Sequence, residues 1–176
     1  NPYDALGLLR SAVKDANPVI FAEHALLYGT RGDVPDERYE IPFGQASVVR
    51  PGSDVTIVAY SKMVSVALQA AELLASRGRE AEVIDLRTLR PLDMETVVGS
   101  VRRTGRAAVV EERWRTGGFA AEVASRIHEE AFDHLDGPVA RVGGADVPTP
   151  YAGGLEAAAL PDVQRVVDAI EESYGL

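Results

Sequence analysis

The sequence of 176 residues contains no cysteine, so the chain can form neither a disulfide framework nor a thiolate metal site. This composition fits a reducing compartment. The chain also lacks an apolar run of about 18 residues, the length that a membrane-spanning helix needs. The opening residues, NPYDALGLLR, have no basic flank before an apolar core and predict no secretion signal. Because the first residue is Asn1 and not methionine, we expect the chain to open inside a longer fold.

Two phosphate-binding motifs of α/β proteins, the G-x-G-x-x-G fingerprint and the P-loop, are missing as well. The stretch RTGGF (115–119) places two glycines where a strand should meet a helix. Free amides there suit an anion, although we favour a plain tight turn. His24, His128 and His134 lack the i, i+4 spacing of a helical zinc pair, so each is expected on the surface or in packing contacts.

Positive charge is scarce in this chain. It has 18 Lys and Arg against 27 Asp and Glu, which gives a formal net charge of −9. Negative charge repels nucleic acid phosphates and anionic membrane surfaces, so neither is expected as a partner. A basic protein surface is the partner that this charge favours. The hydrophobic content of 46% is enough for a buried core and predicts a globular chain with one large domain, alone or with part of another.

What the sequence does contain is a regular alternation of apolar strands and amphipathic helices. Asn1 and Pro2 favour the start of a helix that ends near Asp15. The apolar stretch PVIFAEH (18–24) then predicts a short buried strand, and residues 29–44, rich in Gly, Pro and charge, predict a linker. Strands are predicted after the linker at 54–60, 81–86, 107–112 and 139–143, and helices at 62–76, 94–103, 118–130 and from Pro161 onward. This order predicts an α/β fold with a mostly parallel sheet covered by helices on both faces.

Three neighbouring residues at the end of the strand predicted at 107–112 are candidates for function. Glu111 and Glu112 stand at a carboxyl strand end, where open α/β sheets bind their ligands. Since no base or hydroxyl partner stands at a fixed spacing, we favour a solvated strand end or an ion pair over a catalytic role. Trp114, the only tryptophan, is expected to pack in the core or in an interface.

Five segments, taken in order, resemble a known family: NPVIFAEHALLYG, IPFGQASVVRPGSDVTIVAYSKMV, AEVIDLRTLRPLDMETVVGSVRRTGRAAVVEE, GGFAAEVASRIHEEAF and GADVPTPYA. Together they resemble the second half of the β-subunit of thiamine-diphosphate-dependent 2-oxo acid dehydrogenases, most closely the pyruvate dehydrogenase decarboxylating component. The resemblance covers essentially the whole chain. It implies that residues 1–30 are the last helix and strand of a pyrimidine-binding domain, 31–44 a linker, and 45–176 a transketolase-type C-terminal domain.

The resemblance implies a part in the oxidative decarboxylation of pyruvate to acetyl-lipoyl groups. In such an assembly the β-subunit joins an α-subunit and a second β-subunit as α2β2, and thiamine diphosphate with magnesium carries the chemistry. The family's cofactor-activating glutamate and active-site histidine lie earlier in its chain. Residues 1–176 alone are therefore expected to hold no catalytic residue, bind no cofactor and be inactive. The implied location is the bacterial cytoplasm or, in a eukaryote, the mitochondrial matrix.

A structural potassium site is also implied by the resemblance, at the turn after the first helix. Its ligands there would be the backbone oxygens of Ala12 and Val13 and the turn oxygens of Asp15 and Asn17. An all-oxygen set suits a hard cation. The plain alternative is that Asp15 and Asn17 only cap the turn before Pro18.

The resemblance further implies a docking site for the basic subunit-binding domain of a dihydrolipoyl acyltransferase. The residues that correspond to it are Asp136, in FDHLDGP, and the terminal carboxylate of Leu176. Negative charge at both positions would complement a basic partner. Alternatively, Asp136 is a simple turn residue before Gly-Pro.

Other functions remain open at this point. The alternative is the same role in a branched-chain 2-oxo acid or acetoin dehydrogenase, because the substrate-selecting residues are expected outside this chain. A transketolase-like or synthase homologue would carry the same C-terminal domain. A free-standing α/β module that docks a basic protein and performs no chemistry would also explain the acidic composition.

Overall fold

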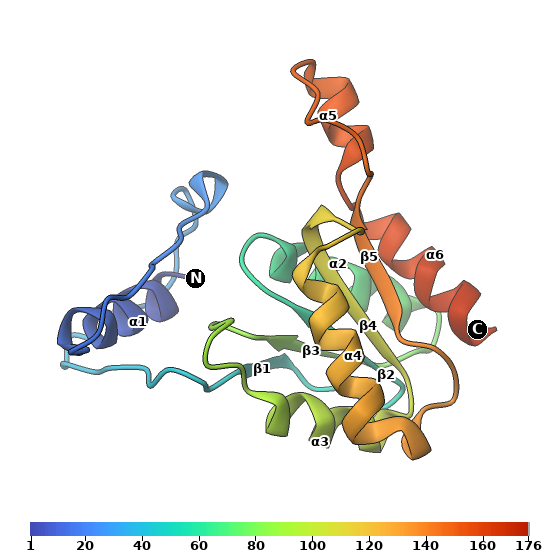
Figure 1. The fold of residues 1–176 in the computed structure, drawn as a ribbon, viewed down its shortest axis with the longest axis horizontal. Helices are drawn as coiled ribbons and strands as arrows, with labels where there is room; N and C mark the ends of the chain where they lie inside the picture. Colours follow the sequence, from blue (N-terminus) through green and yellow to red (C-terminus); the bar gives the residue numbers. More distant parts are fainter. Residues whose placement is uncertain (176) are drawn as a thin grey trace.

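The computed structural model describes residues 1–175 as an α/β body beside a smaller N-terminal segment, residues 1–46 (Figure 1). The strands are β1 (Ser47–Arg50), β2 (Val55–Ala59), β3 (Ala81–Asp85), β4 (Ala107–Trp114) and β5 (Ala140–Gly144). The α-helices of the body are α2 (Met63–Ser76), α3 (Met94–Thr104), α4 (Phe119–Ala131), α5 (Gly153–Ala159) and α6 (Val163–Tyr174). The remaining elements are α1 (Pro2–Lys14) and the short 3-10 helices η1 (Ala25–Leu27) and η2 (Phe132–His134).

The strands form one sheet in the order β1-β3-β2-β4-β5. β1 runs antiparallel to β3, and every other pair of neighbours is parallel. The mostly parallel sheet predicted from the sequence is therefore confirmed. β1 was not predicted, because this four-residue edge strand is partly exposed and lacks the continuous apolar run of the buried strands.

Helices cover both faces of the sheet, as predicted. α2 and α6 pack on one face, where Leu74 and Ile170 are fully buried, and α3 and α4 pack on the other, where Ile127 is fully buried. β2 lies in the middle and is buried along its whole length. Its polar residue, Thr56, bonds through its hydroxyl to Ser100 and Thr104 of α3 at 2.6 and 2.8 Å. The buried hydroxyl thus has partners, which removes most of the cost of placing it in the core.

The ends of the helices follow from capping residues in the sequence. The Asp93 carboxylate accepts a hydrogen bond from the backbone N–H of Thr96 (3.0 Å) at the start of α3. Asp162 caps α6 in the same way through the N–H of Arg165 (2.8 Å). At the end of α3, Gly105 has φ +68°, a left-handed conformation that favours glycine. α5 was not predicted, because its seven residues are too short to show a helical period.

α1 forms where the sequence predicted a helix, with Asn1 as its cap. The Asn1 side chain accepts a hydrogen bond from the N–H of Asp4 at 2.9 Å. Asp4 is itself buried and forms an ion pair with Arg87 of the body at 2.6 Å. Beyond this ion pair, α1 packs on residues 39–41, where Tyr3 stacks on Tyr39 with ring centroids 4.4 Å apart. The helix is therefore held mainly by the segment that follows it and by one buried charge contact.

The buried strand predicted at residues 18–24 is wrong. The segment is extended but pairs with no strand among residues 1–175, and Ile20 is 96% exposed. An apolar run shows that a segment can be buried, but a strand also needs a neighbour that accepts its backbone hydrogen bonds. The described chain supplies no such neighbour, so the apolar side chains face outward.

Residues 29–46 contain neither helix nor strand, which agrees with the predicted linker. The division into residues 1–30, 31–44 and 45–176 stays a prediction, since the fold alone does not fix where one domain ends. Within residues 1–175, none of the helices is long and apolar enough to cross a membrane.

Candidate functional site

The carboxyl ends of the parallel strands meet at the edge of the body that carries α5. β4 ends at Trp114 and β5 at Gly144, and these two residues are paired across the sheet. Residues 145–160, here called the projecting loop, then carry α5 away from the body (Figure 1). In open α/β sheets, ligand sites lie at this edge, beside the point where the strand order reverses. That point is between β2 and β4, because β3 follows β2 on one side and β4 lies on the other.

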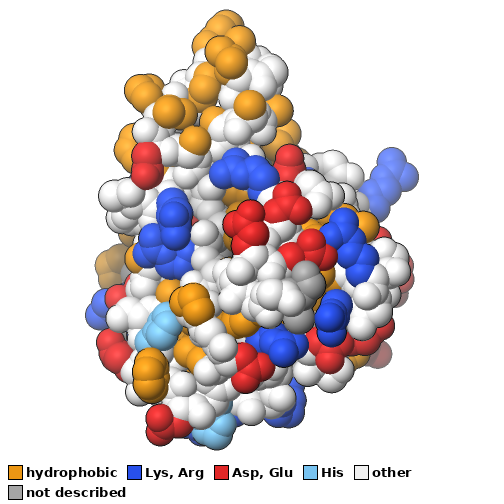
Figure 2. Space-filling model, turned by 90° about the vertical axis from the view of Figure 1, so that its right-hand side faces the viewer, with side chains coloured by type: hydrophobic (Ala, Val, Ile, Leu, Met, Phe, Trp, Pro, Cys, Tyr) orange, Lys and Arg blue, Asp and Glu red, His pale blue; other side chains and the backbone are white. Residues whose placement is uncertain are grey.

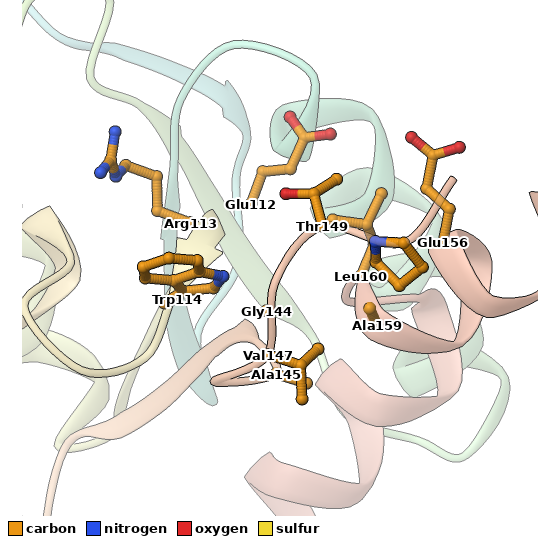
Figure 3. A pocket seen from close by; sticks show the side chains of 11 residues that line it. Glu112, Arg113, Trp114, Gly144, Ala145, Val147, Thr149, Glu156, Ala159 and Leu160 are labelled. Carbon is orange, nitrogen blue, oxygen red and sulfur yellow. The ribbon is translucent and has the colours of Figure 1, made fainter. Parts of the chain in front are cut away.

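A surface pocket of about 390 Å³ lies between the end of β4 and α5, and we call it the α5 pocket (Figure 3). Its apolar lining is formed by Trp114, Val147, Pro150, Ala159 and Leu160. Glu112, Thr149 and Glu156 add polar groups, and Figure 3 shows their oxygens on the same side of the pocket. The Arg113 guanidinium lies beyond Trp114, away from Glu156. The pocket thus combines an aromatic and aliphatic wall with two carboxylates.

Trp114 is half exposed (50%), so it belongs to the surface and not to the core. Of the two roles expected from the sequence, only a contact in an interface fits this position. Three large side chains of the projecting loop are also exposed, Val147, Tyr151 and Leu155. Figure 2 shows hydrophobic side chains gathered at the projecting tip, where Figure 1 places α5. Such an apolar tip on a charged protein is typical of a protein contact surface.

Glu112 forms a contact that the sequence did not reveal. His24 Nε2 lies 2.8 Å from Glu112 Oε2, which joins the N-terminal segment to the end of β4. The N–H of Leu26 donates to His24 Nδ1 (3.2 Å), so Nδ1 acts as the acceptor and Nε2–H donates to the carboxylate. His24 and Glu112 are 88 positions apart, so no local pattern in the sequence could predict their contact. The expected strand-end role of Glu112 fits this hydrogen bond, and His24 is a packed residue as predicted.

Glu111 lies in a different environment from its neighbour and is fully buried. The Tyr60 hydroxyl donates to Glu111 Oε2 at 3.0 Å, and burial together with the charge of Glu111 raises the pKa of Tyr60. A solvated strand end is therefore wrong for Glu111. Its Oε1 lies against Gly118 at the start of α4, where a Cβ atom would be only 1.9 Å away. Within the described residues, Oε1 has no hydrogen-bond partner, but it lies beside the start of α4, and a helix start favours negative charge.

A brace holds the RTGGF stretch to the projecting loop. The backbone N–H and the hydroxyl of Thr116 donate to the Asp146 carboxylate at 3.2 and 2.7 Å. Both hydrogen bonds lower the pKa of Asp146, and the bond from the Thr116 hydroxyl is the larger cause. Gly117, beside Thr116, has φ +70° and makes the tight turn that the sequence favoured. The brace fixes the loop beside the α5 pocket.

The chain matches the sequence profile described as "Transketolase, C-terminal domain" over residues 44–166. This chain belongs to the transketolase C-terminal domain family. The α/β fold with a mostly parallel sheet agrees with that membership.

Curated relatives extend the similarity over the N-terminal segment. The chain is 48% identical to "Pyruvate dehydrogenase E1 component subunit beta, mitochondrial" of Dictyostelium discoideum, over 94% of this chain and 48% of the relative. It is 48% identical to "Pyruvate dehydrogenase E1 component subunit beta" of Rickettsia felis, over 97% of this chain and 53% of the relative. For the subunit "beta-1, mitochondrial" of Arabidopsis thaliana the identity is 49%, over 96% of this chain and 48% of the relative. The chain spans about half the length of the curated relatives it matches.

A solved structure of the same family has a similar fold. It is described as "Split gene transketolase, inactive beta4 tetramer", and it is 33% identical with a TM-score of 0.64. The match covers 78% of this chain and 44% of the solved chain. The curated relatives confirm the resemblance to pyruvate dehydrogenase β-subunits, and this solved structure supports the fold.

In this transketolase-family chain, the predicted potassium ligands lie at the end of α1. Asp15 Oδ1 accepts hydrogen bonds from the backbone N–H (2.8 Å) and side-chain Nδ2 (2.9 Å) of Asn17. The backbone bond is the larger cause of the lowered pKa of Asp15. This is the plain turn expected as the alternative. The oxygens that this turn leaves available are the second Asp15 carboxylate oxygen, the Asn17 side-chain oxygen and the backbone carbonyls of Ala12 and Val13. Oxygen ligands of this kind suit a hard cation, so the residues fit potassium. The site itself stays a prediction.

Asp136 lies just before β5, at the amino ends of the parallel strands, whereas the α5 pocket lies at their carboxyl ends. Its carboxylate is 57% exposed and forms an ion pair with Arg106, with Oδ2 3.2 Å from Nε. Its backbone N–H donates to the carbonyl of Gly105 at 2.8 Å, which supports the turn role. Leu176, the other predicted docking residue, lies outside the described residues 1–175. Part of the Asp136 charge is therefore already compensated within the chain.

Proposed function

We propose that this chain is the C-terminal part of the β-subunit of a pyruvate dehydrogenase decarboxylating component. The observation that carries the proposal is an identity of 48% to such β-subunits over 94–97% of this chain. The apolar projecting loop and the unpaired apolar segment at residues 18–24 support a role in subunit association. The whole subunit would act in an α2β2 assembly on pyruvate, in the bacterial cytoplasm or the mitochondrial matrix.

Thiamine diphosphate with magnesium would supply the decarboxylation chemistry of the complete enzyme. We assign no cofactor contact to residues 1–176. The residues of this chain would instead form the sheet, the braced projecting loop and the His24–Glu112 contact that holds the N-terminal segment on the body. Their task in the proposed enzyme is to position neighbouring subunits, not to handle protons or substrate.

The alternatives differ in how well the comparisons support them. A transketolase is favoured only by the structure at 33% identity, against 48% for pyruvate dehydrogenase β-subunits. A branched-chain or acetoin dehydrogenase has the same fold requirement, but the relatives named above are pyruvate dehydrogenase β-subunits. A non-catalytic docking module would account for the exposed surfaces but not for the identity along nearly the whole chain.

The proposed function predicts activity only for the complete assembly. The full-length chain that contains these residues, co-expressed with its α-subunit, should release carbon dioxide from pyruvate when thiamine diphosphate and magnesium are added. Residues 1–176 alone should release none under the same conditions. A branched-chain 2-oxo acid, assayed in parallel, serves as the control substrate. Preference for that acid would overturn the assignment to pyruvate, and activity of residues 1–176 alone would overturn the proposed division of labour.

We extend the proposal to a potassium ion at the end of α1, held by oxygens of Ala12, Val13, Asp15 and Asn17. The free oxygens at this turn support it, although the Asp15–Asn17 turn would form without an ion. The assembled enzyme should therefore have a higher melting temperature in KCl than in NaCl at the same concentration. Equal melting temperatures in the two salts would argue for the turn alone.

The acyltransferase dock at Asp136 and Leu176 is likewise a proposal. The exposure of Asp136 and the acidic net charge support attraction of a basic domain, while the ion pair with Arg106 limits the charge that Asp136 can offer. Asp136→Asn keeps the shape of the side chain and removes its charge. We expect this change to weaken binding of the subunit-binding domain by less than about 1 kcal/mol, as is usual for exposed ion pairs.

The measurement is a calorimetric titration of the subunit-binding domain into the assembled enzyme at low and high salt. The loss should shrink as salt rises, because charges farther apart than about 10 Å are screened at 0.1 M ionic strength. Asp133→Asn, on an exposed acid of η2 three residues away, is the matched control. Unchanged affinity for Asp136→Asn at low salt would show that Asp136 is only a turn residue.

A further inference from the structure

The α5 pocket has the chemistry of a site for a cation on an apolar stem. The exposed indole of Trp114 forms one wall, and an indole face attracts an ammonium or guanidinium group. Leu160 and Pro150 line the pocket as an apolar surface for methylene groups. The oxygens of Glu112, Thr149 and Glu156 lie together on one side, where a charged head would end (Figure 3).

The charges around the pocket leave one carboxylate free. Glu156 is exposed and makes no side-chain hydrogen bond or ion pair with any of residues 1–175. Glu112 gives one oxygen to His24 and lines the pocket with the rest of its side chain. Arg113, the one cationic side chain lining the pocket within the described chain, points away from Glu156 in Figure 3. Negative charge therefore dominates the side of the pocket where Glu156 lies.

We propose that the α5 pocket receives a lysine or arginine side chain from a non-identical partner subunit. This inference rests on the proposed function, because it requires an assembly of different chains. The identity of the partner follows from charge. A second copy of this chain would bring a further net charge of −9 to a pocket that already holds Glu112 and Glu156, whereas a basic surface of a different subunit would complement these carboxylates.

The position of the pocket suits an anchor within a larger contact. Tyr151 and Leu155 are exposed on the same projecting loop and would be covered by the partner around the inserted side chain. Figure 2 shows this apolar tip above a face with charges of both signs. The Thr116–Asp146 brace holds the loop in place before the partner arrives. Aromatic anchors surrounded by exposed apolar side chains are typical centres of subunit contacts.

The test compares matched charge changes inside and outside the pocket. Glu156→Gln and Glu156→Lys are introduced into the full-length chain, and Glu72→Gln and Glu72→Lys serve as controls. Glu72 is also exposed on a helix and makes no side-chain hydrogen bond or ion pair within the described residues, but it lies on α2, far along the chain from the pocket. Mass photometry measures the dissociation constant for the partner subunit and, in the same sample, the self-association of this chain.

We expect Glu156→Gln to raise the dissociation constant for the partner subunit about 5-fold at low salt, and Glu156→Lys to raise it about 30-fold or more. Both Glu72 changes should stay within about twofold. Equal effects at the two positions would overturn the proposal. A loss confined to self-association would also overturn it, because the occupant would then be a second copy of this chain.

Trp114 supplies a second readout that does not depend on the Glu156 variants. The full-length chain is labelled with 5-fluorotryptophan, and Trp114→Phe identifies the fluorine resonance of Trp114. Addition of unlabelled partner subunit should shift that resonance, and Glu156→Lys should reduce the shift. An unmoved resonance in a sample where the subunits have assembled would overturn the proposal. Decarboxylation of pyruvate is assayed separately. An assembled enzyme that is active on pyruvate but shows no effect of the pocket variants would contradict the pocket proposal and leave the proposed function intact.

Discussion

Replacing Gly118 with alanine is expected to lower the free energy of unfolding by about 3 kcal/mol, because the added methyl group has no room. Its Cβ would lie 1.9 Å from Glu111 Oε1 and 2.5 Å from the carbonyl oxygen of Trp114. The backbone of Gly118 is extended with φ −74°, so the effect comes from the collision and not from backbone strain. The glutamate is fully buried, which prevents it from swinging into solvent. Urea unfolding, followed by the fluorescence of Trp114, measures the loss.

Gly99→Ala is the matched control for this substitution. Gly99 lies inside α3, and a Cβ atom there would meet no other atom within 4 Å. Alanine should stabilise that helix by about 0.5–1 kcal/mol, the difference in helix propensity between the two residues. If Gly118→Ala and Gly99→Ala changed the stability equally, Glu111 would not occupy the place against α4 that the structure gives it.

Leu74→Ala is expected to cost about 3–4 kcal/mol of stability, the usual range for deleting a fully buried leucine side chain. Leu74 of α2 is 0% exposed and belongs to the core between the sheet and the pair α2 and α6. The loss has two parts. Folding no longer gains the free energy of burying the removed methyl groups, and the cavity left in the core removes packing contacts. Thermal and urea unfolding of the variant, with an unchanged circular dichroism spectrum at low temperature, give the measurement.

Leu155→Ala provides the comparison, since Leu155 is 63% exposed on α5. Its stability should stay within about 0.5 kcal/mol of the parent, because no buried contact is lost. A loss at Leu155 as large as that at Leu74 would mean that the projecting loop packs on the body, contrary to the structure. Reduced subunit association of Leu155→Ala at unchanged stability would agree with the proposed contact surface.

The local pattern of the sequence determined most of the α/β body. The helix predicted from Pro161 onward is present as α6, and its Val166, Val167 and Ile170 are fully buried. The helix predicted at 94–103 is present as α3, and Asp93 caps its start. These features follow from residues a few positions apart, because helix period, strand burial and capping depend on neighbours along the chain. The family followed in the same way from motifs such as GADVPTPYA, whose order is a property of the sequence.

The tertiary structure alone decided which charged and aromatic residues meet. Glu111 and Glu112 are adjacent, yet the alternation of a strand buries one against Gly118 and turns the other toward His24. The strand predicted at residues 18–24 is unpaired because pairing needs a neighbour that no local pattern can supply. The α5 pocket brings Trp114 to residues some 30–45 positions later, since β4 and β5 end side by side. Contacts of this kind depend on how the chain returns to itself in space, which period, caps and composition do not encode.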